Sequence, residues 1–89
     1  MADKTGKRVI ITAGEQILHF SVTLDDFHRY QNEMSMDNKV TPSKNFLART
    51  VEADDQAVME QLISEGYALD LAAMVAGEFR PALELSVKK

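Results

Sequence analysis

Two histidines and a pair of adjacent aspartates are the residues of this 89-residue chain whose types best suit acid–base or metal chemistry. His19 stands in a run of alternating apolar and polar residues, and His28 follows Asp25 and Asp26. No motif links either histidine to a nucleophile, and neighbouring carboxylates on a helix point in different directions, which makes a poor acid–base pair. We therefore interpret the histidines as ordinary, partly exposed residues and the aspartates as helix-capping residues.

The sequence also has no motif for a metal, a phosphate or a reactive thiol. It has no cysteine, no His-Glu-x-x-His pair and no calcium-binding loop of the EF-hand kind. The four glycines are isolated from one another, which excludes a glycine-rich phosphate loop. We therefore predict no catalytic residue, no cofactor and no metal, and a protein that is not an enzyme and acts by binding.

Composition indicates a single domain over residues 1–89, with a flexible N-terminus at 1–7 and a tail at 88–89. Apolar residues make up 45% and charged residues 27%, unlike a disordered chain. The absence of cysteine argues against a small secreted domain held by disulfides, and the polar N-terminus lacks the apolar core of a signal peptide. The apolar runs are too short to span a membrane. These features predict a cytoplasmic protein.

The formal net charge of −4 disfavours non-specific binding to nucleic acids or anionic lipids. A winged helix-turn-helix protein is the rival interpretation, because Lys39, Lys44 and Arg49 lie near one another in the sequence. A recognition helix should carry clustered basic residues, yet the stretch with the strongest apolar stripe carries four acidic residues and no basic one. We favour a solvated polar face for the three basic residues and expect no nucleic acid partner.

Residues 8–22 predict a β-hairpin. The runs Val9–Thr12 and Ile17–Val22 are rich in β-branched and other large apolar residues, and apolar and polar residues alternate in the second run. Between the two runs, Gly14 can adopt the positive φ of a tight turn. The alternation predicts one apolar face and one polar face.

Two helices are expected directly after the hairpin. Thr23 and the two aspartates that follow it favour a capped helix over 24–35. Thr41–Pro42 favours the start of a second helix, since proline is tolerated at the first helical position, where its missing N–H costs nothing. Three residues form the apolar side of this second helix, namely Phe46, Leu47 and Val51.

Two further helices and a short strand complete the expected fold. The third helix is predicted from Asp54 or Asp55, whose carboxylates would cap it, to Gly66, and the fourth over 68–80. Residues 82–87 alternate with period two and predict a third short strand. We therefore predict the α+β class: a small antiparallel sheet, made of the hairpin and the C-terminal strand, covered on one face by three to four helices.

The segment Tyr30–Val51 has an unusual composition. It combines aromatic and methionine side chains with one proline and with asparagines at 32, 38 and 45. Asparagine side chains can bond nearby backbone groups, and methionines fill cores and adaptable binding surfaces alike. Two interpretations stay open: a loop held by asparagine side chains over a Met/Phe core, or a peptide-binding groove.

Two strings of residues resemble a family of phage tail assembly chaperones. The first string is Asp26-Phe27-x-x-Tyr30-x-Asn32-Glu33. The second string is Asn38-Lys39-Val40-x-Pro42-x-x-Asn45-Phe46-Leu47-x-Arg49-Thr50-Val51. The hairpin, the acidic third helix and the short final strand also stand in the expected order, so the resemblance covers nearly the whole chain.

The resemblance implies a protein of the bacterial host cytoplasm that binds the phage tape measure protein, keeps this long helical chain soluble and helps to recruit the tail tube protein. Seven residues of the two strings are the candidates for the partner-binding surface, although several could equally belong to the core: Tyr30, Asn32, Lys39, Pro42, Asn45, Phe46 and Leu47. The alternatives are a small nucleic-acid-binding regulator of phage or prophage origin and a structural subunit of the virion.

Overall fold

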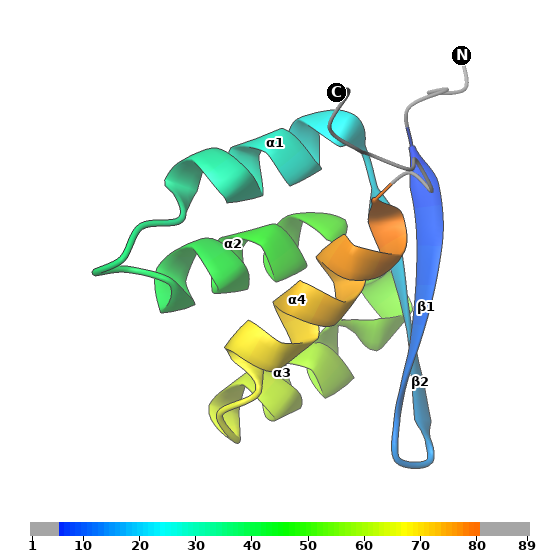
Figure 1. Ribbon diagram of the computed structural model, residues 1–89. Coiled ribbons are helices and arrows are strands. Elements are labelled where there is room, and N and C mark those ends of the chain that lie inside the picture. The colour runs from blue at the N-terminus through cyan, green and yellow to red at the C-terminus, as the bar shows by residue number, and fades with distance from the viewer. Residues whose placement is uncertain (1–5, 81–89) are drawn as a thin grey trace, which may run out of the picture.

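The computed structural model describes residues 6–80 and shows two layers, a β-hairpin and a group of helices on one face of it (Figure 1). The hairpin consists of β1 (Lys7–Ala13) and β2 (Gln16–Val22). The helical layer consists of α1 (Leu24–Glu33), α2 (Val40–Thr50), the short 3-10 helix η1 (Ala53–Asp55), α3 (Gln56–Ser64) and α4 (Ala68–Phe79). The predicted α+β class is confirmed. The strand predicted at 82–87 lies outside the described residues.

The hairpin forms as its alternation predicts. Its ladder closes at the pair Ala13–Gln16, which leaves a two-residue turn. Gly14 has a φ of +64° in this turn, and no described residue other than a glycine has a positive φ, so the turn is of type II′. The face toward the helices carries the buried side chains of Val9, Ile11, Leu18, Phe20 and Val22.

Thr23 caps α1 as predicted. Its hydroxyl accepts a hydrogen bond from the Asp26 N–H at 3.1 Å, and the Asp26 carboxylate accepts one from the Thr23 N–H at 3.1 Å, which is a capping box. The helix ends at Glu33 and not at the predicted residue 35. Tyr30 packs against the core from this helix, whereas its neighbour Gln31 is exposed.

The start of α2 differs slightly from the prediction. The helix begins at Val40, so Pro42 is its third residue and not its first. Proline is tolerated there too, because the N–H groups of the first turn have no acceptor within the helix. Val51, which we predicted inside this helix, is its C-cap residue and forms an isolated β-bridge with Phe20.

The predicted carboxylate cap of α3 is wrong. Asp55 is the N-cap residue, but its side chain makes no hydrogen bond to the helix, which follows directly on η1. Oδ2 of Asp55 instead accepts a hydrogen bond from the His19 N–H at 2.8 Å and lies 2.8 Å from Nδ1 of His19. The long-range contact is preferred because it satisfies a backbone donor that β2 presents at its outer edge.

The prediction that Gly66 follows the end of α3 as its C′ residue is confirmed, and the helix itself ends at Ser64. Gly66 has a φ of +97°, which a residue with a side chain adopts only with strain. Its N–H donates to the Ile63 carbonyl and the Tyr67 N–H donates to the Leu62 carbonyl, each at 3.0 Å. This Schellman motif reverses the chain at once, so that α4 starts at Ala68.

The segment between α2 and α3 covers the outer edge of β2. The Glu52 N–H donates to the His19 carbonyl at 2.9 Å. The Glu52 carboxylate accepts two hydrogen bonds from the Arg8 guanidinium, at 2.8 and 2.9 Å, and one from the Ser21 hydroxyl at 3.1 Å. These hydrogen bonds and the Arg8–Glu52 ion pair connect the helical layer to the hairpin.

Low pH is expected to weaken the contacts that Asp55 and Glu52 make with the hairpin. The pKa of the Asp55 carboxyl lies below its ordinary value, chiefly because the His19 side chain, and then the His19 N–H, bonds to it. The Arg8 guanidinium likewise lowers the pKa of Glu52. A carboxyl whose pKa is lowered on folding stabilises the fold above its unfolded pKa of about 4, and the contribution is lost as pH falls through the folded value. The free energy of unfolding should therefore decrease below about pH 4.

Urea unfolding at a series of pH values measures this decrease. Asp55→Asn should show a shallower decrease than the wild type, because the variant lacks a carboxyl whose pKa is lowered by its contacts in the fold. Asp54→Asn, which changes the exposed neighbour, is the matched control and should follow the wild-type curve. Equal slopes for Asp55→Asn and the wild type would contradict the role given to Asp55.

Candidate partner-binding groove

Four of the seven residues predicted for the partner-binding surface lie in or against the hydrophobic core. Phe46 and Leu47 are fully buried, and Pro42 on the same helix is buried too. The ring of Tyr30, half-buried on α1, stacks on the ring of Phe46 with the centroids 4.6 Å apart and the planes at 27°. The two rings hold α1 against α2, and a partner does not reach Phe46 or Leu47 while the fold is intact.

The other three predicted residues, Asn32, Lys39 and Asn45, are exposed on the α1–α2 helix pair. The loop between these helices is held by the Ser35 N–H, which donates to the Asn38 carbonyl at 3.1 Å, and by the Asn38 N–H, which donates to Oγ of Ser35 at 3.0 Å. These contacts use a serine side chain and the backbone of Asn38, and not the asparagine side chains that the sequence suggested.

Arg49 faces acidic residues and not solvent. Its Nε lies 3.7 Å from a carboxylate oxygen of Asp26, and its Nη1 lies 4.0 Å from one of Glu33. The side chain is 23% exposed, so the guanidinium is mostly withdrawn from the surface. Of the three basic residues that made nucleic acid the rival partner, only Lys39 and Lys44 are exposed.

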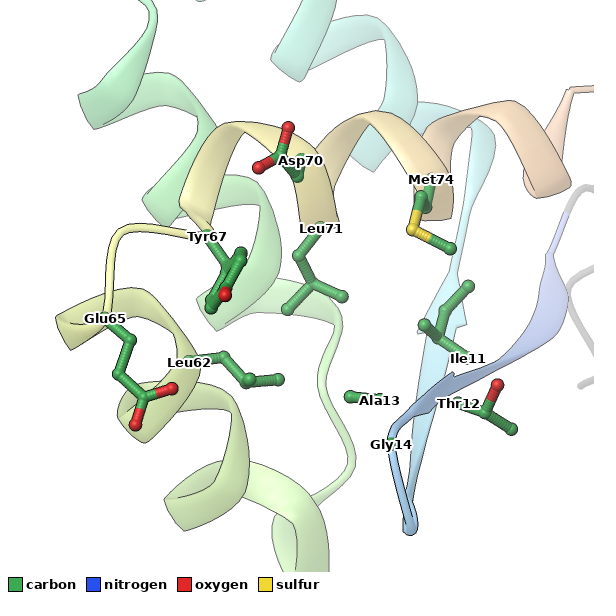
Figure 2. Close-up of a pocket in the computed structure, with 10 residues that line it drawn as sticks. All are labelled: Ile11, Thr12, Ala13, Gly14, Leu62, Glu65, Tyr67, Asp70, Leu71 and Met74. Atoms are coloured by element: carbon green, nitrogen blue, oxygen red, sulfur yellow. The ribbon is translucent and has the colours of Figure 1, made fainter.

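A groove lies between β1 and α4, and its part toward the hairpin turn, drawn in Figure 2, is mainly apolar. It consists of two adjoining cavities of about 400 and 610 Å³ that share Ile11, Thr12 and Met74. The first cavity lies toward the hairpin turn, and the second lies toward the C-terminal end of α4. We call this feature the β1–α4 groove, and its principal lining residues are Ile10, Thr12, Leu62, Tyr67, Leu71 and Met74.

Side chains from both layers converge on the groove. In Figure 2, Leu71 and Met74 extend from α4 toward Ile11, and Leu62 extends from α3 toward the hairpin. Tyr67, at the start of α4, is 50% exposed and Met74 is 52% exposed. The groove therefore presents large apolar side chains to solvent, which single exposed residues scattered over a surface do not do.

The rim of the groove is acidic. Glu65 and Asp70 line the first cavity from the helical side, and Figure 2 shows the Asp70 carboxylate directed away from the apolar centre. Glu78 lines the second cavity. Residues 50–79 contain seven of the fourteen acidic residues of the chain and none of its ten Lys and Arg residues. An apolar floor with this rim suits a partner segment whose apolar residues are flanked by Lys or Arg.

The groove follows from the way α4 crosses the hairpin. The C-terminal end of α4 lies beside the start of β1, where Nζ of Lys7 donates to the Glu78 carbonyl at 2.7 Å (Figure 1). The buried Val75 and Phe79 belong to the core on this side. Toward its N-terminus the helix diverges from β1, and the space between them is lined by side chains but not filled by them.

Sequence reasoning missed this groove, although the sequence contains a signal for it. Ile10 stands on the face of the hairpin that we predicted to be polar, and it is 55% exposed. Met74 is 52% exposed and stands outside the buried stripe of α4, which includes Leu71, Val75 and Phe79. Apolar residues outside the buried stripes of two neighbouring elements are the pattern that could have located it.

Other kinds of site find less support in the described part of the chain. Within residues 6–80, no three side chains of histidine, aspartate or glutamate come together in a way that could hold a metal ion. None of the helices in the same range is long and apolar enough to cross a membrane. His19 is engaged by Asp55, and His28 is exposed on α1.

Comparison with known proteins identifies a family. No curated protein and no solved structure matches the chain. A family model described as "Phage tail assembly chaperone" matches residues 9–89, which include most of the hairpin, all the helices and the groove. The chain therefore belongs to the phage tail assembly chaperone family.

Proposed function

We propose that this chaperone binds the phage tape measure protein in the host cytoplasm and keeps it soluble while the tail assembles. Family membership supports a role in tail assembly. The observation that carries the proposal is the β1–α4 groove, an apolar surface with Tyr67 and Met74 half exposed, in a chain whose net charge is −4.

An apolar groove in a charged protein suits this function, because such a chaperone must cover apolar segments of its partner and does not need to change them chemically. Apolar segments of an unassembled partner aggregate because water drives them together, and a groove that covers them removes this driving force. The charged exterior of the chaperone then keeps the complex dissolved. We propose that binding of this kind is the whole activity, without a cofactor and without catalysis.

A second contact surface is proposed on α1 and α2, where Asn32, Lys39 and Asn45 are exposed. Tyr30, Pro42, Phe46 and Leu47 would support this surface from below, since they lie in or against the core. We assign this second surface to the tail tube protein, and the β1–α4 groove to the tape measure protein. A triple replacement of the three exposed residues by alanine, which leaves the core intact, tests the surface in a binding assay.

Co-purification tests the proposed function. The tagged chaperone and the tape measure protein are produced together in bacteria, and the tagged protein is recovered at moderate salt. We expect the tape measure protein to elute with the chaperone and to be missing when an unrelated tagged protein of similar size and charge replaces it. A tape measure protein that does not elute with the wild-type chaperone would contradict the proposal.

Two rival functions predict different results in two further experiments, an analysis of purified phage particles and a gel-shift assay. A virion subunit would be present in purified phage particles in a fixed ratio to the tail proteins, whereas we expect the chaperone to be absent from them. A nucleic-acid-binding regulator would shift DNA or RNA in a gel with a steep dependence on salt. We expect no such shift, because Arg49 is mostly buried and faces the carboxylates of Asp26 and Glu33.

A further inference from the structure

The outer edge of β1 has backbone groups that no other described strand pairs with. The N–H and the carbonyl of His19 point away from β1, since they bond to Asp55 and to the Glu52 N–H. His19 faces Ile10 across the ladder, so this pair is of the kind that exchanges no hydrogen bonds, and the N–H and carbonyl of Ile10 must point away from β2. The direction of the backbone groups repeats every second residue along a strand, so the N–H and carbonyl groups of Arg8 and Thr12 also point away from β2.

Within residues 6–80 this edge lacks the usual protection. Exposed sheet edges are commonly blocked by proline, by a bulge or by a charged side chain at the middle of the strand. β1 has no proline, its pairing with β2 is regular from Lys7 to Ala13, and its central residue is Ile10. The outer edge of β2, in contrast, is covered by the segment that carries Glu52 and Asp55. Within residues 6–80 the sheet has two strands only.

The open edge and the β1–α4 groove lie at the same place. Thr12 and Ile10 contribute to the groove from β1, and Met74 lines both of its cavities from α4. A strand added to β1 would lie about 4.8 Å from it and would point every second side chain toward the helical layer. These side chains would enter the groove beside Met74 and Leu71, where Figure 2 shows apolar side chains directed toward β1.

We propose that β1 takes up an extended segment of the tape measure protein as an added strand, with alternate apolar side chains in the groove and Lys or Arg residues against its acidic rim. The inference rests on the proposed function and assigns the binding mode. Backbone bonds to Ile10 and Thr12 give affinity, and the groove gives specificity for alternating apolar residues. The rim of Glu65, Asp70 and Glu78 selects the flanking basic residues.

A pair of proline variants tests the edge. Ile10 and Ile17 are 55% and 53% exposed and lie in opposite strands, and neither donates a hydrogen bond within the ladder. Proline at either position therefore removes only an outward N–H. With the full-length chain and the tape measure protein as probe, Ile10→Pro should raise the Kd at least about tenfold, whereas Ile17→Pro should bind as the wild type does.

A pair of methionine variants tests the groove without touching the backbone. Met74 lines the groove, and Met36 is 92% exposed in the loop between α1 and α2. Met74→Lys should weaken binding at least about tenfold, because a charge replaces an apolar contact beside a basic ligand. Met36→Lys introduces the same charge elsewhere and should leave the Kd unchanged. This pair decides the question if Ile10→Pro does not fold.

Hydrogen exchange identifies the occupant of the edge. In the free full-length chain the amides of Ile10 and Thr12 should exchange fast, and the tape measure protein should protect them. Protection already present in the free chain would overturn the proposal, since residues 81–89 or a second copy would then hold the edge. Wild-type affinity in both Ile10→Pro and Met74→Lys would reject the binding mode alone. A wild-type chain that does not bind the tape measure protein would reject the proposed function itself.

Discussion

Phe46→Ala is expected to lower the free energy of unfolding by about 3–5 kcal/mol, the usual cost of truncating a buried phenylalanine. Phe46 is fully buried, and the loss includes its stacking contact with Tyr30 at 4.6 Å. Domains of this size have a total stability of roughly 5–15 kcal/mol, so the variant should be partly unfolded at the growth temperature of its host.

Urea denaturation followed by circular dichroism measures the effect. Lys39→Ala is the matched control, because Lys39 is exposed at the start of the same helix and its replacement should change the free energy by less than about 0.5 kcal/mol. A Phe46→Ala protein that keeps wild-type stability but no longer binds the tape measure protein would show that Phe46 is a contact residue and would contradict the core assignment.

Two glycine-to-alanine changes should have opposite effects on stability. Gly66 has a φ of +97°, and alanine there should cost about 1–3 kcal/mol of backbone strain. Gly77 lies inside α4 with a negative φ, and alanine there should stabilise the protein by about 0.5–1 kcal/mol. An added Cβ meets no atom within 4 Å at either position, so backbone conformation alone sets the two signs.

Thermal unfolding of the two variants beside the wild type checks the pair. The midpoint should fall for Gly66→Ala and rise for Gly77→Ala. A stable Gly66→Ala protein would mean that the chain does not turn through a left-handed residue between α3 and α4, and it would remove the Schellman motif from the description of the fold.

Local signals in the sequence were enough for much of the fold. The alternation in 17–22, the glycine of the turn and the Thr23 cap each act over a few residues, and each led to the correct element. The role of Gly66 as the C′ residue of α3 was predictable for the same reason, since a Schellman motif is built from neighbours in the chain.

Long-range contacts account for what sequence reasoning did not find. Asp55 looked like a helix cap, but its partner His19 lies 36 residues away in the sequence. Phe46 and Asn45 are adjacent in one motif, yet one is buried and the other exposed, which depends on the helix that packs against α2. Ile10 and Met74 could have indicated the place of the β1–α4 groove, but its shape depends on the angle at which α4 crosses the hairpin, and no local pattern specifies that angle.

The most direct test of the account is the solubility of the tape measure protein in cells. We predict that it is found mainly in the pellet when produced alone, and mainly in the supernatant when produced with the wild-type chaperone or with Met36→Lys. With Met74→Lys it should return to the pellet, provided that this variant is itself folded and soluble. A tape measure protein that stays in the pellet with the wild-type chaperone, or that is soluble without it, would contradict the account.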